Sequence, residues 1–209
     1  MKKKRPDFDS RAAEWDKLPR RVALANAVLE LIKREIEPQP WMRVLDYGCG
    51  TGLVTMGLQP LVKEIIAVDS SAGMLEQLQS KALETGALNL STFFIDLDKE
   101  WKLPAGIDLL VSSMTMHHVP DVAPLLAHFR SVMSPGSWLC ISDLEKEDGS
   151  FHDDQSSDIP HHGFEIEEME SFFKKAGFSD IKTMPVMNVK KERNEGLHLY
   201  PVNLTIGKN

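Results

Sequence analysis

The sequence predicts an α/β protein with one seven-stranded, mostly parallel sheet, an antiparallel C-terminal hairpin and helices on both faces of the sheet. Two observations lead to this fold class. Apolar runs that suit buried strands alternate with segments of helical periodicity, which is the pattern of a parallel sheet covered by helices. The last two strand-like runs are joined by a short charged segment, whereas a parallel pair would need a longer crossover.

The expected strands are runs of mainly Val, Ile, Leu or Phe bounded by turn residues, which are typical of strands buried on both faces. They cover residues 42–47, 64–69, 91–96, 107–113, 137–143, 180–189 and 197–206. The charged segment KKERNEG is expected to join the last two strands.

Helices are expected before and between these strands. Residues 11–36 carry Ala, Leu, Val and Ile at helical spacing, and Pro19 interrupts them. We therefore expect a short helix, a break and a longer helix that ends near Pro38. Further helices are expected over 52–59, 71–85, 121–133 and 165–175.

Composition limits the classes of partner. The 209 residues suffice for one domain. A net charge of −7 and a pI near 5.5 argue against nucleic acid. No apolar run approaches the ~20 residues of a membrane span, and no signal peptide follows the basic start, so no membrane partner is expected. Cys49 and Cys140 both lie in apolar runs, which argues against a disulfide framework and favours a cytoplasmic location. The oligomeric state is left open.

The stretch VLDYGCGTG (44–52) places three glycines directly after an expected strand and before an expected helix. Glycine lets a ligand approach the backbone closely, because no Cβ stands in the way. The carboxyl end of a parallel strand is also where open α/β sheets bind ligands. Gly48, Gly50 and Gly52 therefore indicate a binding loop, with a tight structural turn as the alternative.

Three aspartates, Asp46, Asp69 and Asp96, stand at successive strand ends beside this loop. The second can accept both hydroxyls of a ribose, and the third lies where a nucleobase would extend. Each could instead cap the following helix. Together with the glycines they describe a nucleoside site.

The same segment argues against other nucleotide sites. It lacks the GxxxxGK[ST] pattern of a nucleoside triphosphate cradle. The loop reads G-x-G-x-G rather than the dinucleotide pattern G-x-G-x-x-G, and the carboxylate of Asp46 would repel a pyrophosphate. That carboxylate would suit a ligand with an ammonium group and a sulfonium.

These residues resemble the class I S-adenosylmethionine-dependent methyltransferases, in their small-molecule branch (methyltransferase domains 11, 12 and 25). VLDYGCGTG is similar to the first motif of that family, and AVDSSAGML (67–75) is similar to the second. FFIDLD, VSSMTMHHVPD and VMSPGSWLCISD resemble its later segments. The resemblance implies a Rossmann-like fold, with S-adenosyl-L-methionine as cofactor and S-adenosyl-L-homocysteine as product.

The resemblance also implies roles for individual residues. The methionine part would be held by Asp46, Gly48, Cys49, Gly50 and Gly52, the ribose by Asp69, Ser70 and Met74, the adenine by Asp96 and Leu97, and the methyl end by Ser113 and Met114. The single domain, 1–209, would divide into a helical cap (1–38), a cofactor-binding core (40–145) and a substrate side of loop, last helix and hairpin (146–209). Within the cap, Phe8 and Trp15 would close over the cofactor as a lid, or Trp15 would pack on the sheet.

Histidines are the candidate catalytic residues. Methyl transfer is an in-line displacement in which alignment supplies much of the rate, and a base is needed only when the acceptor must lose a proton. His117 and His118 follow the fourth strand, where the methyl group would emerge, and histidine titrates near neutrality. Alternatively, they line the pocket without titrating or cap the turn before Pro120.

A second group of histidines and aspartates lies in FHDDQSSDIPHHGF (151–164). The candidate substrate-pocket residues are Trp15, His117, His161 and His162; a solvated loop is the alternative for the segment. A metal site is a further alternative, because imidazole and carboxylate are common ligands. No metal ligand is assigned, since adjacent histidines rarely point at one ion and no HExxH spacing occurs.

The leading hypothesis is therefore S-adenosylmethionine-dependent methyl transfer to a small, uncharged or cationic molecule. A catalytically silent nucleoside-binding regulatory protein is an alternative, although the intact acids and glycines weigh against it. A nicotinamide-dependent oxidoreductase is a third, weakened by the loop spacing and by Asp46.

Overall fold

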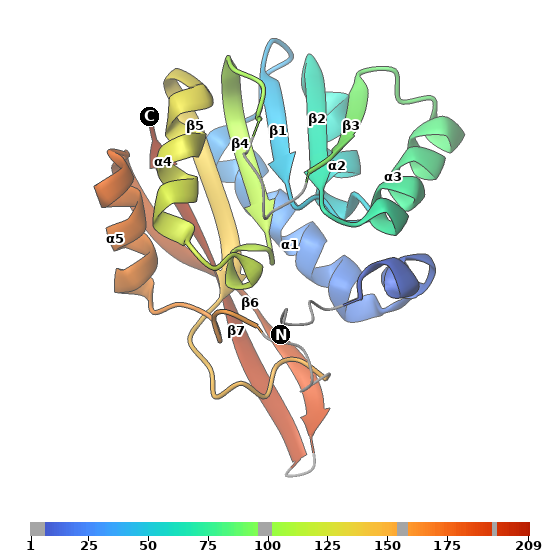
Figure 1. Ribbon diagram of the computed structural model, residues 1–209, viewed down its shortest axis with the longest axis vertical. Helices are drawn as coiled ribbons and strands as arrows, with labels where there is room; N and C mark the ends of the chain where they lie inside the picture. The colour runs from blue at the N-terminus through green and yellow to red at the C-terminus, as the bar shows by residue number, and fades with distance from the viewer. Residues whose placement is uncertain (1–6, 96–101, 154–158, 194–195) are drawn as a thin grey trace.

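The computed structural model describes residues 7–95, 102–153, 159–193 and 196–209 (Figure 1). Within these residues, seven strands form one sheet in the order β3-β2-β1-β4-β5-β7-β6. Strands β1 to β5 pair in parallel, and β7 is antiparallel to both β5 and β6. The predicted fold class, with its antiparallel C-terminal hairpin, is confirmed.

The strand bounds follow the apolar runs closely at the centre of the sheet and less closely at its C-terminal edge. The strands are β1 Arg43–Tyr47, β2 Glu64–Asp69, β3 Leu90–Phe94, β4 Ile107–Ser113, β5 Met133–Leu144, β6 Ser179–Arg193 and β7 Gly196–Lys208. β2 and β4 have the predicted bounds. β5 begins earlier than predicted, because Met133 already pairs with Ile107 of β4.

The largest departure concerns the segment KKERNEG, which was predicted to be a connection. Its first four residues belong to β6 and its last residue to β7, with Lys190 paired to Leu199 and Arg193 to Gly196. The sequence did not predict this part of the strand, because its charged residues are typical of a solvent-exposed connection. The side chain of Lys191 is buried and pairs at 3.0 Å with the exposed carboxylate of Asp153, which compensates its charge. The hairpin therefore projects beyond the carboxyl ends of the parallel strands (Figure 1).

Helices cover both faces of the sheet. The helices are η1 Asp9–Lys17, α1 Pro19–Ile36, α2 Leu53–Leu58, η2 Gln59–Leu61, α3 Ala72–Thr85, η3 Met116–His118, α4 Val122–Val132 and α5 Ile166–Ala176. The predicted break at Pro19 is confirmed, since Pro19 takes the first position of α1, where a missing N–H costs nothing. The segment before it is a 3₁₀ helix rather than an α-helix. None of the described helices is long and apolar enough to span a membrane.

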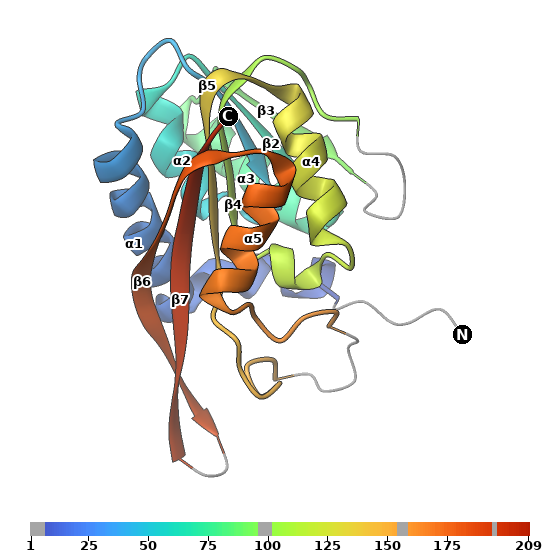
Figure 2. The same ribbon diagram turned by 90° about the vertical axis from the view of Figure 1, so that its left-hand side faces the viewer.

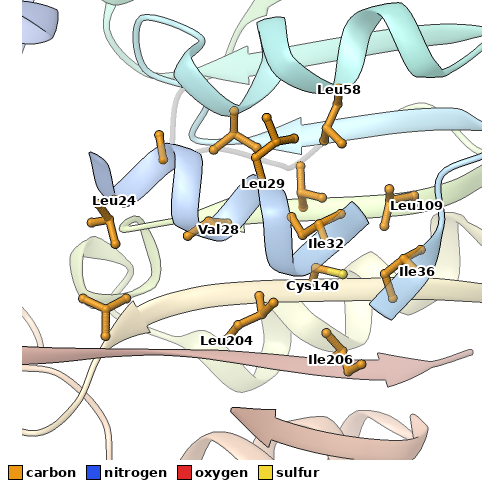
Figure 3. Packing of buried hydrophobic residues seen from close by; sticks show 14 of the residues in the cluster. Leu24, Val28, Leu29, Ile32, Ile36, Leu58, Leu109, Cys140, Leu204 and Ile206 are labelled. Carbon is orange, nitrogen blue, oxygen red and sulfur yellow. The ribbon is translucent and has the colours of Figure 1, made fainter. Parts of the chain in front are cut away.

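The core consists of two apolar layers, one on each face of the sheet. Helices α1 and α2 lie on one face and α4 and α5 on the other (Figure 2). On the α1 face, Val28 and Ile32 pack over Leu109, Cys140 and Leu204 of three strands (Figure 3). Neighbouring residues in the strands point to opposite faces, so both layers are filled at once. Such a rigid sheet holds its carboxyl-end loops in fixed positions.

Candidate functional site

A cavity lies at the carboxyl ends of β1, β2 and β4. The loops after these strands form one part of its lining, and η1, the first turns of α1, η3, residues 151–153 and β6 form the rest. We call the part around Asp46, Gly48, Gly50 and Asp69 the glycine end. The part around His117, His118, His152, Arg20 and Arg21 is called the histidine end.

The glycine loop leaves its backbone open toward the cavity. Gly50 has φ +53°, and a Cβ added there would meet no protein atom within 4 Å. Gly48 has φ +73°, and its added Cβ would lie 2.3 Å from Oγ1 of Thr115. Both dihedrals lie in the left-handed region that glycine tolerates best. Glycine is therefore required at position 48 because a side chain would collide with Thr115, and at position 50 because of the left-handed backbone.

Asp69 is fixed by the loop that it faces. Its Oδ2 accepts a hydrogen bond of 2.7 Å from the amide of Gly50, and its Oδ1 accepts one of 2.9 Å from the amide of Ser71. Burial raises the pKa of Asp69, while these amides oppose the rise. The carboxylate thus sits in the cavity wall with a set orientation, beside Ser70 and Met74.

Asp46 is a buried acid in the wall of the cavity. It accepts a hydrogen bond of 2.5 Å from Oγ1 of Thr55. Burial, followed by the negative charge of Asp69, raises the pKa of Asp46 to about 7. A cationic group in the cavity would stabilise its ionised form.

The end of β4 carries an uncommon backbone conformation. Met114 has φ +56°, and its amide donates a hydrogen bond of 2.8 Å to the carbonyl of Ser142 on β5. A non-glycine residue in this region is strained, and such strain clusters at functional sites. Ser113 and Met114 both line the cavity.

Most residues predicted to hold a cofactor meet in this cavity. Asp46, Gly48, Cys49, Gly50, Asp69, Ser70, Met74, Ser113 and Met114 all line it. Gly52 does not. It precedes α2, and its added Cβ would lie 2.2 Å from Cδ1 of Leu78, so it serves the close packing of α2 on α3. Asp96 and Leu97 lie outside the described residues.

Hydrogen bonds to two of its aspartates hold helix η1 over the cavity. Oδ1 of Asp9 accepts hydrogen bonds from Oγ of Ser71 at 2.5 Å and from the amide of Gly73 at 2.9 Å. Oδ1 of Asp16 accepts one of 2.6 Å from Oγ1 of Thr51. These contacts connect the cap to the loops after β1 and β2. The geometry is that of a cover over the glycine end.

Phe8 and Trp15 carry this cover toward the histidine end. Phe8 meets the rings of Trp15 and His118 edge-on, with centroids 5.9 and 5.2 Å apart. The guanidinium of Arg21 lies 3.5 Å from the ring centroid of Trp15. Burial, followed by the charges of Arg20 and Arg11, lowers the pKa of Arg21 to about 10. Phe8 and Trp15 both line the cavity, as expected of a lid.

The histidine end centres on His117. Its ring is buried, and Nδ1 lies 2.6 Å from Oδ1 of Asp143 at the end of β5. A carboxylate only accepts hydrogen bonds, so Nδ1 carries the proton and Nε2 is left for the cavity. His118 and His152 lie beside it, with ring centroids 4.1 and 5.2 Å from that of His117.

His161 and His162, predicted as pocket residues, do not line the cavity. Nε2 of His161 lies 3.2 Å from the carbonyl of Pro120, and its ring packs on Phe164. Nδ1 of His162 lies 3.7 Å from Oε1 of Glu147. The prediction was wrong for this pair, because both rings pack elsewhere, and His152 of the same segment lines the cavity instead.

Cationic residues are the part of the site that sequence reasoning missed. Arg11, Arg20, Arg21 and Lys191 all line the cavity. A signal existed for Arg21, which stands three and four positions before the buried Leu24 and Ala25 on one helical face. No such signal marked Lys191, because it lies among other charged residues.

Comparison with known proteins identifies the family of the chain. A family model described as a methyltransferase domain matches residues 13–183. An uncharacterized methyltransferase of Schizosaccharomyces pombe is 27% identical over 157 residues, which are 68% of this chain and 55% of that protein. The chain spans about half or less of the length of the curated relatives that it matches first. The predicted resemblance to class I methyltransferases is confirmed.

Solved structures share the fold across nearly the whole chain. A Haloferax volcanii methyltransferase, solved in complex with the Trm112 methyltransferase activator, has a TM-score of 0.77 at 17% identity, with 98% of each chain covered. A SAM-dependent methyltransferase from Aquifex aeolicus has a TM-score of 0.69 at 20% identity, covering 96% of this chain and 97% of the other. At these identities the likeness establishes the fold.

Proposed function

The chain belongs to the methyltransferase-domain family, and on that premise we propose that it transfers a methyl group from S-adenosylmethionine to a small molecule bound in the same cavity. The observation that carries the proposal is the composition of the cavity. One cavity joins an open glycine backbone, the buried Asp46 and the partly buried Asp69 to a cluster of histidines and arginines. We infer that the nucleoside donor binds at the glycine end and the acceptor at the histidine end.

The residues of the glycine end fit the donor. The open backbone at Gly50 admits a close ligand. The carboxylate of Asp69, oriented by the amide of Gly50, would accept hydrogen bonds from the ribose hydroxyls. The buried carboxylate of Asp46 would pair with the ammonium group. When bound, S-adenosylmethionine supplies an electrophilic methyl group on a sulfonium sulfur. The end of β4 lines the same cavity and leads into η3, which carries His117 and His118.

The charges of the histidine end point to an acceptor with an anionic group. Arg20, Arg21 and Lys191 line the cavity there, and Asp153 offsets part of their charge through Lys191 at 3.0 Å. Sequence analysis led us to expect an uncharged or cationic acceptor, because only the net charge of the whole chain was in view. Guanidinium groups bind carboxylates and phosphates, so we favour an acceptor with such a group.

The cover formed by η1 and Phe8 would hold the acceptor in line with the donor. Holding reactants in alignment supplies much of the rate of a displacement. The two cysteines are buried and unpaired, which supports a reducing compartment such as the cytoplasm for this reaction.

Calorimetric titration with S-adenosylmethionine, S-adenosylhomocysteine and NAD separates this proposal from its alternatives. We expect micromolar binding of the first two and none of NAD. The variant Asp69→Ala should weaken binding by about 1–3 kcal/mol, because ribose hydroxyls lose a buried partner. Asp121→Ala, at an exposed position without a side-chain cap bond, is the control. NAD binding, or unchanged affinity in Asp69→Ala, would contradict the proposal.

A further inference from the structure

Three histidines converge at the histidine end. One ring nitrogen from each of His117, His118 and His152 lies within 4.8 Å of the others, a grouping found among the described residues. The ring centroids of His118 and His152 are 5.3 Å apart. The three rings therefore surround one small space.

The 3₁₀ turn η3 explains how two consecutive histidines reach that space. In a strand, neighbouring side chains point to opposite faces. In η3 the rings of His117 and His118 instead lie side by side, with their planes 45° apart. This local geometry removes the first of the two reasons against a metal, that adjacent histidines rarely point at one ion.

Two nitrogens of the trio are buried without a hydrogen-bond partner among the described residues. They are Nδ1 of His118 and Nε2 of His152. Buried polar atoms are normally paired, and an orphaned one needs an explanation. Neutral imidazoles with unshared nitrogen lone pairs are the form that binds metal ions.

Asp143 orients the third ligand. Its Oδ1 accepts the Nδ1 proton of His117, and its Oδ2 accepts a hydrogen bond of 3.3 Å from the amide of His117. Carboxylate–histidine pairs of this kind stand behind most metal-binding imidazoles, where they fix the tautomer and make the ligand more basic. Asp143 is itself buried.

The loop residue His152 is held in place by its two neighbours. Lys191 and Arg193 of β6 both contact the carbonyl of Phe151 and the carboxylate of Asp153. The ring of Phe151 also packs edge-on against Tyr200, with centroids 5.2 Å apart. The segment is therefore clamped to the hairpin on both sides of the histidine. The buried ammonium group of Lys191 therefore helps to position His152.

We propose that His117, His118 and His152 bind a divalent transition metal ion, best matched by Zn²⁺, with a fourth position open to the cavity. Three imidazoles and one open position are the ligand set of catalytic zinc sites. Tetrahedral Zn²⁺ holds nitrogens at about 2.0–2.1 Å, hence about 3.4 Å from one another. Small rotations of the three side chains would bring them to that spacing.

The open position would take the acceptor atom, a step that rests on the proposed function. A hydroxyl or thiol bound there is acidified by the metal and gives its proton to water. The lone pair of the resulting anion forms the new bond to the methyl carbon, while the old carbon–sulfur bond breaks and its electron pair stays on the donor sulfur. The inferred acceptor class is therefore an anionic molecule with a hydroxyl or thiol group.

Titration of the chelator-treated, full-length protein with Co²⁺ tests the site. Tetrahedral Co²⁺ absorbs visible light, so we expect bands that saturate at one ion per chain and disappear when Zn²⁺ is added. His152→Ala should weaken Co²⁺ binding at least about 100-fold, and Asp143→Asn about 10–100-fold. His198→Ala removes a histidine that does not line the cavity and should leave binding unchanged.

His152→Ala is the chosen variant because it lies in a loop, whereas His117 is fully buried. Circular dichroism and titration with S-adenosylmethionine establish that the variant is folded. Absence of visible bands in the parent protein, or full Co²⁺ affinity in His152→Ala, would overturn the metal site. If the parent protein binds Co²⁺ but no S-adenosylmethionine, the site stands and the proposed function fails.

Discussion

The glycine end of the cavity comes from adjacent strand ends, whereas the histidine end is assembled from segments far apart in the sequence. Asp46 lies in β1, Gly50 follows it and Asp69 ends β2, and these two strands pair directly along the sheet. Arg21, His117 and His152 come from α1, η3 and the loop after β5. The first end is a product of local backbone geometry. The second exists only once the whole domain has folded.

This difference separates what is general in the fold from what is particular to this chain. The parallel sheet itself creates a ligand site at its carboxyl edge. The acceptor side depends on which side chains the added segments bring to that edge. Substitutions at the glycine end should therefore act on donor affinity, and those at the histidine end on metal and acceptor binding.

The largest effect at the glycine end is expected for Gly50→Ala. The new Cβ enters open space beside the cavity, so it would meet the ligand rather than the protein. We expect affinity for S-adenosylmethionine, measured by calorimetry, to fall by about 1–3 kcal/mol, or about 5–150-fold.

Gly86→Ala is the matched control for this substitution. Gly86 has φ +67° and equally open surroundings, but it ends α3 and does not line the cavity. Both variants should lose about 1–2 kcal/mol of unfolding free energy through the left-handed backbone. Equal ligand affinity in the two variants would mean that the donor does not approach Gly50.

The glycine end could be predicted from the sequence because each of its residues is placed by a strand end. β2 and β4 have the predicted bounds, so Asp69 and Ser113 fall at the ends of the apolar runs, where the sequence places them. Gly52 is the exception. Its role depends on contact with Leu78 of α3, and loop spacing carries no information about helix packing.

The histidine end could be predicted only in part, because its contacts are long-range. Neighbouring histidines were visible, but the 3₁₀ turn that aligns His117 with His118 was not. His152 could not be told from His161 and His162, since the clamp by Lys191 depends on β6 continuing through a charged segment. Charge patterning indicated solvent there, and tertiary contacts overrode it.

Asp46→Asn should separate the stability of the glycine end from its ligand affinity. The pKa of Asp46 is about 7, against an ordinary value of 3.8. Between these values the unfolded chain carries the charge while the folded protein stays protonated, so this acid destabilises the fold increasingly as pH rises to about 7. Asn, whose amide oxygen still accepts from Thr55, removes that penalty.

We therefore expect the ligand-free variant to melt at a higher temperature than the parent protein at pH 8, with little difference at pH 4. Its affinity for S-adenosylmethionine should be about tenfold lower, because the ammonium group loses its counter-charge. Thermal unfolding across pH and calorimetry at pH 8 measure the two effects. A lower melting temperature at pH 8 would show that Asp46 is already paired with a cation in the free protein.

The smallest effect is expected where the cover meets the glycine end. Asp9→Ala removes the acceptor for Ser71 and Gly73, the bonds that lower the pKa of Asp9. Because Asp9 is exposed, the loss should be about two- to threefold in affinity for S-adenosylmethionine, with faster proteolysis before α1. Glu14→Ala, which breaks only the exposed pair with Lys17, is the control.

The parent protein should lose the same contact as pH falls below the ordinary range of aspartate, so its affinity should converge on that of Asp9→Ala in acid. Unchanged affinity in Asp9→Ala would mean that η1 is held by its apolar contacts through Phe8 and Trp15, and that one rigid cover closes both ends of the cavity without the hydrogen bonds of Asp9.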